Sequence, residues 1–213
     1  MMGEKADCMW TDPPYGVNYV GKTRDALTIE NDGSGNLPIL LSGCYEVADY
    51  NLRDGAPIYV AHPPGALQMI FNSEFVKIGW KFHETLVWIK DVMVLGHSDY
   101  HYKHEPIMYG WKGKNRSWYS DRSEVTTLEF DRPKRSSEHP TMKPVELVQK
   151  CISNSTQKNN IVYEPFSGSG TTLIACENLG RKCRAIELSP AYVAIAIERY
   201  QQATGKMPEL INA

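Results

Sequence analysis

The chain has 213 residues, of which 42% are hydrophobic and 23% are charged. A chain of this length can bury roughly 70% of its unfolded surface. Its composition excludes a disordered tail, a collagen-like fibre and a small disulfide-held scaffold. Because 23 Lys and Arg residues nearly balance 25 Asp and Glu residues, the net charge of −2 confines any nucleic-acid surface to a local patch.

The first half of the chain predicts buried strands that alternate with helices. The apolar run Ala6–Thr11 ends at Asp12 and two prolines, as a buried strand does when it enters a rigid turn. The polar, glycine-bearing stretch 18–36 predicts a long loop. The other expected elements are a helix over Leu37–Tyr50, a strand over Pro57–Ala61, a helix over about residues 65–79, and antiparallel strands over Thr85–Lys90 and Glu105–Trp111.

The second half returns to the same alternation after an irregular segment. Residues 112–138 have few aliphatic side chains and no clean period, so we expect an irregular insert within a single domain that spans residues 1–213. Together these elements predict a doubly wound, parallel α/β sheet. The expected elements are a helix that opens at Pro144, a strand over Ile161–Pro165, a helix over Thr171–Leu179, a strand over Lys182–Leu188, and a helix from Ser189 to about Ala203 with Val193, Ile195 and Ile197 in the core.

A strand, a glycine turn (FSGSG) and a helix follow one another in the last quarter of the chain. Glycines let the backbone approach a ligand closely, and the start of the helix offers free N–H groups. Glu187 follows Gly170 by 17 residues, about where an acid meets the ribose hydroxyls of a nucleotide. Position 173 is leucine instead of the third glycine of the diphosphate fingerprint, so S-adenosylmethionine, which has a ribose and no diphosphate, fits better. An ordinary strand–helix turn remains an equal alternative on the glycines alone.

A second motif, Asp12-Pro13-Pro14-Tyr15, follows the first predicted strand, where open sheets bind ligands. The two prolines fix the backbone and remove two N–H donors, which leaves carbonyls and one carboxylate as a cluster of acceptors. Such a cluster suits an aromatic amine, whose lone pair must be drawn out of the ring before it can attack an electrophile. The ring of Tyr15 can stack on a planar base. A simple proline-rich turn is the alternative.

The two motifs together, with HPTMKP (His139–Pro144) between them, are far more specific than either one. In this order the chain resembles the DNA amino-methyltransferases of the permuted, beta-class motif order over roughly Ala6–Tyr200. The resemblance implies a Rossmann-like, doubly wound mixed sheet of seven strands, of the S-adenosylmethionine-dependent methyltransferase type. It also implies a bacterial or phage-encoded enzyme that transfers methyl from S-adenosylmethionine to the exocyclic amine of a base flipped out of duplex DNA.

The resemblance assigns roles to particular residues of this chain. Asp12 and the Pro13 carbonyl accept hydrogen bonds from the target amine, in a turn completed by Pro14, and Tyr15 stacks on the base. Glu187 holds the ribose, and Thr141 and Lys143 lie near the methionine end of the cofactor. The cofactor loop comprises Glu164, Pro165, Phe166, Ser167, Gly168, Ser169, Gly170, Thr171 and Thr172, with Glu164 standing where the family usually has aspartate.

The aspartate that opens the DPPY turn favours adenine N6 as the target, since serine in this place is associated with cytosine N4. We therefore expect a site-specific adenine-N6 DNA methyltransferase, with restriction-modification as one setting. Only eleven residues precede Asp12, so the strand and the Gly-Asp pair that the family commonly carries upstream are not in the sequence. An N4-cytosine enzyme and a non-catalytic DNA-binding relic of the fold stay open as alternatives.

Basic residues interleaved with aromatic ones predict a DNA surface, because phosphate contact and base stacking act together. The insert 112–138 resembles a short target-recognition segment and contains most of them. Solvated loops with ordinary charges are the alternative. The candidates are Lys22, Arg24, Lys112, Lys114, Arg116, Arg132, Lys134 and Arg135. The expected partners are duplex DNA and, as an option, a second copy of the chain in a homodimer.

Three further expectations concern what the protein does not use. Five cysteines without a CxxC pair indicate reduced thiols and a cytoplasmic protein. The longest uncharged stretch, residues 55–73, contains a histidine and two prolines, so no membrane partner is expected. His97, His101 and His104 have a spacing that metal ligands use on helices, but Gly96, Ser98 and the nearby strand argue against a helix, and no metal is expected.

Overall fold

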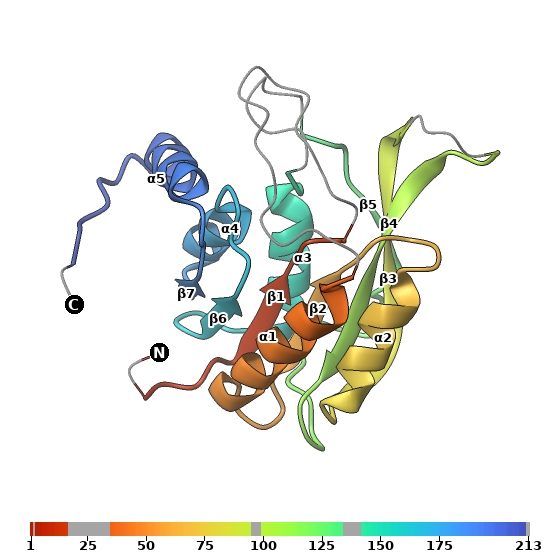
Figure 1. Ribbon diagram of the computed structural model, residues 1–213. Coiled ribbons are helices and arrows are strands. Elements are labelled where there is room, and N and C mark those ends of the chain that lie inside the picture. The colour runs from red at the N-terminus through yellow and green to blue at the C-terminus, as the bar shows by residue number, and fades with distance from the viewer. Residues whose placement is uncertain (2, 17–34, 95–98, 134–141, 212–213) are drawn as a thin grey trace.

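The computed structural model describes residues 1, 3–16, 35–94, 99–133 and 142–211, and the seven strands among them form one mixed sheet (Figure 1). Their order across the sheet is β5-β3-β4-β2-β1-β6-β7. Every pairing is parallel except the two that β4 makes with β2 and β3. The mixed sheet is therefore confirmed, and so is the antiparallel pairing expected between β3 and β4. Strand β4 also pairs antiparallel with β2. The strands are β1 (Cys8–Thr11), β2 (Pro57–Ala61), β3 (Lys81–Val94), β4 (Tyr102–Trp111), β5 (Thr127–Glu129), β6 (Ile161–Glu164) and β7 (Lys182–Ala185).

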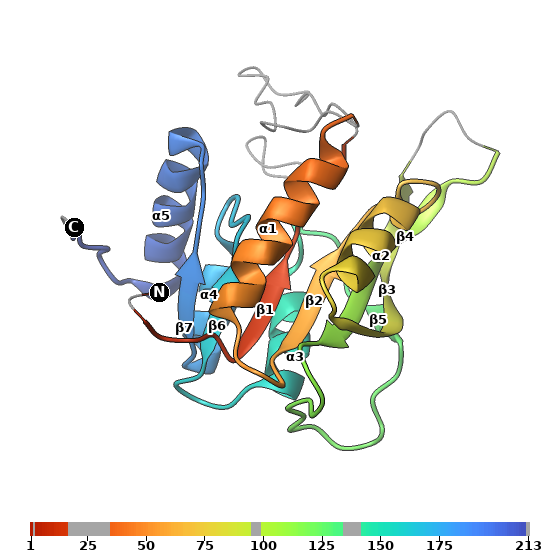
Figure 2. The same cartoon turned by 60° about the horizontal axis from the view of Figure 1, so that its bottom comes forward.

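Helices cover both faces of the sheet, as the view in Figure 2 shows. Helices α1 (Leu37–Asn51) and α2 (Gln68–Lys77) pack on one face, and α3 (Val145–Ser155) and α4 (Thr171–Leu179) pack on the other. Helix α4 lies between two left-handed glycines, Gly170 with φ of 80° and Gly180 with φ of 66°, which set its two ends. Helix α5 (Pro190–Thr204) lies against α4.

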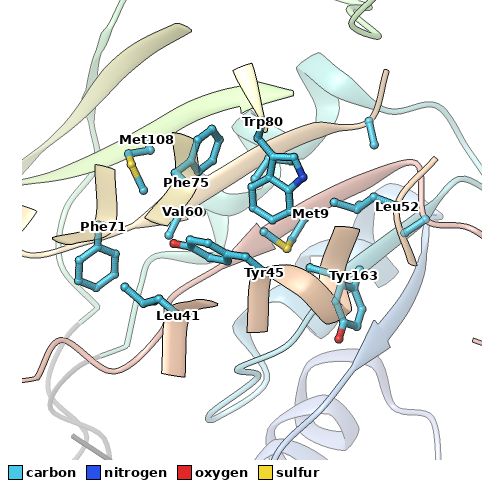
Figure 3. Close-up of a cluster of buried hydrophobic side chains, with 14 of the residues drawn as sticks. Met9, Leu41, Tyr45, Leu52, Val60, Phe71, Phe75, Trp80, Met108 and Tyr163 are labelled. Carbon is cyan, nitrogen blue, oxygen red and sulfur yellow. The ribbon is translucent and has the colours of Figure 1, made fainter. Parts of the chain in front are cut away.

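The core under α1 and α2 fixes the position of the central strand β1 (Figure 3). Met9 of β1 is fully buried in this cluster with Tyr45 of α1 and Phe75 of α2. The ring of Tyr45 packs on Trp80 at 5.0 Å between centroids, and Phe75 meets the same indole edge to face at 5.2 Å. Burial of each large side chain stabilises the fold by about 1.5–3 kcal/mol. The turn that leaves β1 is therefore held by a rigid strand.

Several elements differ from the sequence-based expectations. Strands β3 and β4 extend beyond the ranges expected for them. The segment 112–138 contains the short strand β5, which pairs with β3, so the insert is not irregular throughout. Strand β7 ends at Ala185, three residues earlier than expected. Helix α5 buries Ala196 against Gly170 instead of burying its larger apolar side chains, because it packs beside α4. The prediction of a core role for Val193 and Ile197 is therefore wrong, since they are 37% and 45% exposed, while Ile195 is half-buried.

The register of β1 and β6 brings the two sequence motifs to the same carboxyl-terminal edge of the sheet, where the parallel strands end. Met9 of β1 lies opposite Tyr163 of parallel strand β6. Adjacent strands are roughly 4.8 Å apart, so the turn that follows Thr11 and the loop that follows Glu164 begin side by side. Residues about 150 positions apart in the chain thus meet at the carboxyl ends of parallel strands, where open α/β sheets bind ligands.

Candidate active site

Asp12 stands at the centre of a hydrogen-bonded cluster at this edge. Its Oδ1 accepts a hydrogen bond of 2.9 Å from the Tyr15 hydroxyl, and its Oδ2 accepts one of 2.6 Å from Nζ of Lys143. Lys143 also donates to the Tyr15 hydroxyl at 3.1 Å, and its ammonium lies 5.3 Å from the centre of that ring. The carboxylate is only partly buried, at 29% exposure, so it remains accessible from outside.

A second carboxylate joins this cluster from strand β4. Glu105 contacts Nζ of Lys143 at 3.1 Å through Oε2 and pairs with Lys90 of β3 through Oε1. Burial raises the pKa of Glu105, but attraction to Lys143 and Lys90 outweighs burial and lowers the pKa to about 2. Burial lowers the pKa of Lys143, and the attraction of Asp12 and Glu105 reverses this and raises it well above its ordinary value. The ion pairs of Glu105 with Lys143 and with Lys90 therefore persist at neutral pH.

Hydrogen bonds within its own backbone and to two charged side chains hold the glycine loop in shape. The Gly170 N–H donates to the Ser167 carbonyl at 2.9 Å, and the Gly168 N–H donates to Glu187 at 2.7 Å. Arg199 of α5 donates to the carbonyl and, at 2.7 Å, to the hydroxyl of Ser169. The loop therefore has one fixed shape ahead of α4. The first N–H groups of this helix have no intrahelical partner and can donate to a ligand.

Several sequence-predicted residues lie where expected, with contacts that the sequence did not indicate. The nine residues from Glu164 to Thr172 run from the end of β6 into α4 as one continuous turn. The Glu187 carboxylate, expected to bind a ribose, here accepts the N–H groups of Gly168 and Ser189, at 2.7 and 2.9 Å. Lys143, expected near the methionine end of the cofactor, contacts Asp12 at 2.6 Å.

Glu164 is a fully buried carboxyl that contacts the start of the loop. Its Oε1 accepts a 3.0 Å hydrogen bond from the Phe166 N–H, and its Oε2 accepts one of 2.9 Å from the Thr172 hydroxyl. Burial raises the pKa of Glu164 well above its ordinary value, and the two hydrogen bonds lower it too little to restore it. The carboxyl is therefore held in its neutral form well above the pH at which an exposed glutamate ionises.

Replacement of Glu164 by glutamine tests this neutral state. In the unfolded wild type the carboxyl ionises above about pH 4.5 while the folded state keeps its proton, so wild-type stability falls as the pH rises through this range by up to about 1.4 kcal/mol per pH unit. An amide avoids this loss. We expect Glu164→Gln to become more stable than the wild type as pH rises from 5 to 7 in urea unfolding, whereas equal pH dependence of the two proteins would contradict a raised pKa.

His62 lies at the end of β2, next to the turn that follows β1. Its Nδ1 is 3.0 Å from the Pro63 carbonyl, which only accepts, so Nδ1 is the protonated nitrogen. Burial lowers the pKa of His62, which keeps the ring neutral and leaves Nε2 as an acceptor. Within the described part of the chain this buried Nε2 has no hydrogen-bond partner. The ring packs against Phe71, which also meets Tyr15.

The structure separates the predicted DNA-binding residues into different regions. Trp111 pairs with Pro57 at the start of β2, so Lys112, Lys114 and Arg116, which follow it, lie at the opposite edge of the sheet from Asp12. Lys112 pairs there with Asp49 at 3.0 Å, and Arg116 stacks on the Trp111 ring. These three residues therefore lie away from the Asp12 turn, and their role in DNA binding stays a prediction.

Arg132 lies at the same edge of the sheet as Asp12. Its backbone N–H donates to Asp91, beyond the pairing of β3 with β5. Other predicted positions fall outside the described residues, namely Lys22, Arg24, Lys134, Arg135 and Thr141. In the described ranges no group of three or more His, Cys, Asp or Glu is placed to hold a metal ion, and no helix there is long and apolar enough to cross a bilayer.

Sequence reasoning missed four residues that shape the site. Lys90 and Glu105 look like ordinary charges of a hairpin, and only the pairing of β3 with β4 brings them to Lys143. Arg199 gives no signal within an amphipathic helix. His62 stands directly after a predicted strand, a position that allows it to line a base pocket, but the two prolines that follow favoured a plain turn.

Solved structures of similar shape define the class of fold. The M1.HpyAVI–SAM complex has a TM-score of 0.69 with this chain at 24% identity, over 93% of this chain and 90% of that one. The cytosine-N4-specific PvuII DNA methyltransferase has a TM-score of 0.72 at 15% identity, over 93% of this chain and 82% of that one. The chain thus has the Rossmann-like α/β fold of DNA methyltransferases.

Sequence comparison then gives the family. A family model described as DNA methylase, N6_N4_Mtase, matches residues 6–198, and the chain belongs to this family. Type II methyltransferase M2.LlaDCHI of Lactococcus lactis subsp. cremoris is 26% identical over 92% of this chain and 82% of its own length. Type II methyltransferase M.HpaI of Haemophilus parainfluenzae is 27% identical over 91% of this chain and 67% of its own length. The protein is accordingly a DNA methyltransferase of the N6/N4 amino type.

Proposed function

We propose that the protein transfers a methyl group from S-adenosylmethionine to N6 of adenine in duplex DNA, after the base has been flipped out of the helix. The observation that carries this proposal is the cluster in which Asp12, Tyr15 and Lys143 meet beside the glycine loop. The choice of adenine over cytosine is supported by aspartate, in place of serine, as the first residue of the DPPY turn.

The chemistry of the edge fits the proposed cofactor. The glycine loop allows close approach of a nucleoside, and the start of α4 offers N–H groups to the carboxylate of an amino acid. Glu187, half-buried beside Gly168, is the acid of the same loop. When bound, S-adenosylmethionine supplies a methyl group on a cationic sulfur, which is already a strong electrophile.

The residues of the chain position the amine for attack. Asp12 and the Pro13 carbonyl accept its two N–H groups, which draws the nitrogen lone pair out of the ring and aims it at the methyl carbon. Tyr15 stacks on the base and, through its hydroxyl, holds Asp12 in place. A bound sulfonium would supply the methyl group and keep the electron pair of its carbon–sulfur bond. The Asp12 carboxylate would accept the proton that the nitrogen loses. Catalysis of this kind rests mainly on orientation.

Identification of the product tests the proposal. The protein is incubated with radiolabelled S-adenosylmethionine and duplex DNA, and the DNA is digested to nucleosides and separated. We expect the label in N6-methyldeoxyadenosine. Label in N4-methyldeoxycytidine would replace adenine by cytosine as the target. No label in DNA, from a protein that is folded and binds DNA, would favour the non-catalytic module. The homodimer, the single-domain organisation and the cytoplasmic location stay predictions.

A further inference from the structure

Lys90 of strand β3 is buried, although lysine side chains in strands usually reach solvent. Its side chain is only 5% exposed, on the strand face that also buries Trp88. A buried ammonium is costly unless a carboxylate compensates it, and Glu105 of the neighbouring strand β4 does so. Glu105 is itself only 18% exposed. The hairpin of β3 and β4 therefore carries a buried ion pair at the edge where the Asp12 turn lies.

This ion pair continues into the catalytic cluster. Oε2 of Glu105 lies 3.1 Å from Nζ of Lys143, and the Tyr15 hydroxyl lies 3.4 Å from the same oxygen. Lys143 contacts Asp12 at 2.6 Å. The charges alternate in a row, from Lys90 through Glu105 and Lys143 to Asp12, and they sum to zero. Removal of Glu105 alone would leave two ammonium groups and one carboxylate, a net charge of +1.

We propose that Glu105, backed by Lys90, is a positioning residue for methyl transfer, which holds Lys143 on Asp12 and keeps the transfer site neutral toward a cationic methyl donor. This inference rests on the proposed function, because it assumes a sulfonium cofactor beside Asp12. Glu105 touches neither amine nor methyl group in this role. It fixes the ammonium that fixes the acceptor carboxylate, and it offsets the charge that would otherwise repel the sulfonium.

A set of charge variants separates this role from simple stabilisation of the hairpin. The proteins are the wild type, Glu105→Gln, Lys90→Met, the double variant that combines them, and Glu105→Asp. For each, calorimetry gives the affinity for S-adenosylmethionine, single-turnover labelling gives the transfer rate on duplex DNA, and thermal unfolding gives the stability. Glu124→Gln is the matched control, because Glu124 also pairs with a lysine, Lys150 at 2.7 Å, without joining the catalytic cluster.

We expect Glu105→Gln to weaken cofactor binding by roughly 10–100-fold, since two like charges then face the sulfonium. The double variant restores a net charge of zero, so its cofactor affinity returns to within about threefold of the wild type while its transfer rate stays at least about tenfold low, because Lys143 is no longer held. Lys90→Met keeps full cofactor affinity. Glu105→Asp loses less of its cofactor affinity than of its transfer rate. Glu124→Gln changes neither.

The inference is overturned if the double variant binds the cofactor no better than Glu105→Gln, or if Glu105→Gln changes neither affinity nor rate. A purely structural ion pair would give affinities that follow thermal stability across the set. If the wild type binds the cofactor but labels no DNA, the proposed function fails, while recovery of affinity in the double variant still tests the charge balance by itself.

Discussion

Replacement of Asp12 by asparagine is expected to lower the single-turnover rate of methyl transfer by about 10³-fold, comparable to the loss of a group that directly stabilises a transition state. In the proposed reaction the carboxylate accepts an N–H of the amine and stabilises the positive charge that develops on the nitrogen. An amide offers one weaker acceptor and presents N–H donors to the same amine. Asp12 also pairs with Lys143 at 2.6 Å, so the variant loosens that lysine as well. Rates are measured with labelled cofactor and duplex DNA.

Binding of DNA should survive this change. Cofactor affinity should fall by roughly 10–100-fold, as in Glu105→Gln, because the variant also leaves a net charge of +1 beside the sulfonium, so rates are compared at saturating cofactor. Asp49→Asn is the control, because Asp49 also pairs with a lysine, Lys112 at 3.0 Å, at the opposite edge of the sheet. We expect its transfer rate to match the wild type. An Asp12→Asn protein whose rate stays within about tenfold of the wild type would remove Asp12 from the reaction.

Replacement of Gly170 by alanine is expected to have the largest effect on stability. Gly170 has a φ of 80°, and a Cβ there would lie 2.9 Å from the Cβ of Ala196 in α5. The left-handed backbone costs an alanine roughly 1–2 kcal/mol, and relief of the clash requires movement of α5. We expect a total loss of about 3 kcal/mol, or a fall in Tm of roughly 6–12 °C, measured by thermal unfolding without ligand.

Gly168→Ala provides the matched comparison within the same loop. Gly168 also has a positive φ, of 51°, but a Cβ there would meet no atom within 4 Å. We expect only the backbone cost, about 1 kcal/mol, together with a loss of cofactor affinity of more than about tenfold, because the methyl group occupies the approach of the ligand. Equal losses of stability in the two variants would show that the contact of Gly170 with α5 does not matter.

Strong local signals predicted much of the fold. The bounds of β2 and α4 match the expectations residue for residue, because proline and glycine punctuate them, at Pro57 and at Gly170 and Gly180. The positions of the two motifs also predicted that their loops lie close together, since both follow buried, parallel strands of one sheet. A local pattern is sufficient where the fold places the carboxyl ends of parallel strands at one edge.

What the sequence did not predict depends on long-range pairing, such as that of β4 with β2. Antiparallel strand β4 carries the segment after Trp111 to the far edge, so local basic composition at Lys112–Arg116 could not indicate its distance from Asp12. Lys90 and Glu105 meet only because of the register of the hairpin. The outward face of α5 follows from its packing on Gly170, a contact between helices that periodicity alone does not specify.

The central claim is that one edge of the sheet holds the target amine and the methyl donor together. Its most direct test is the affinity of a bisubstrate compound in which N6 of adenine is linked by a short chain to the nucleoside and amino-acid parts of the cofactor. Such a compound resembles the transition state and should bind one per chain, at least about 100-fold more tightly than S-adenosylmethionine, with most of this gain lost in Asp12→Asn. Binding no tighter than the cofactor itself, and unaffected by Asp12→Asn, would contradict a shared site.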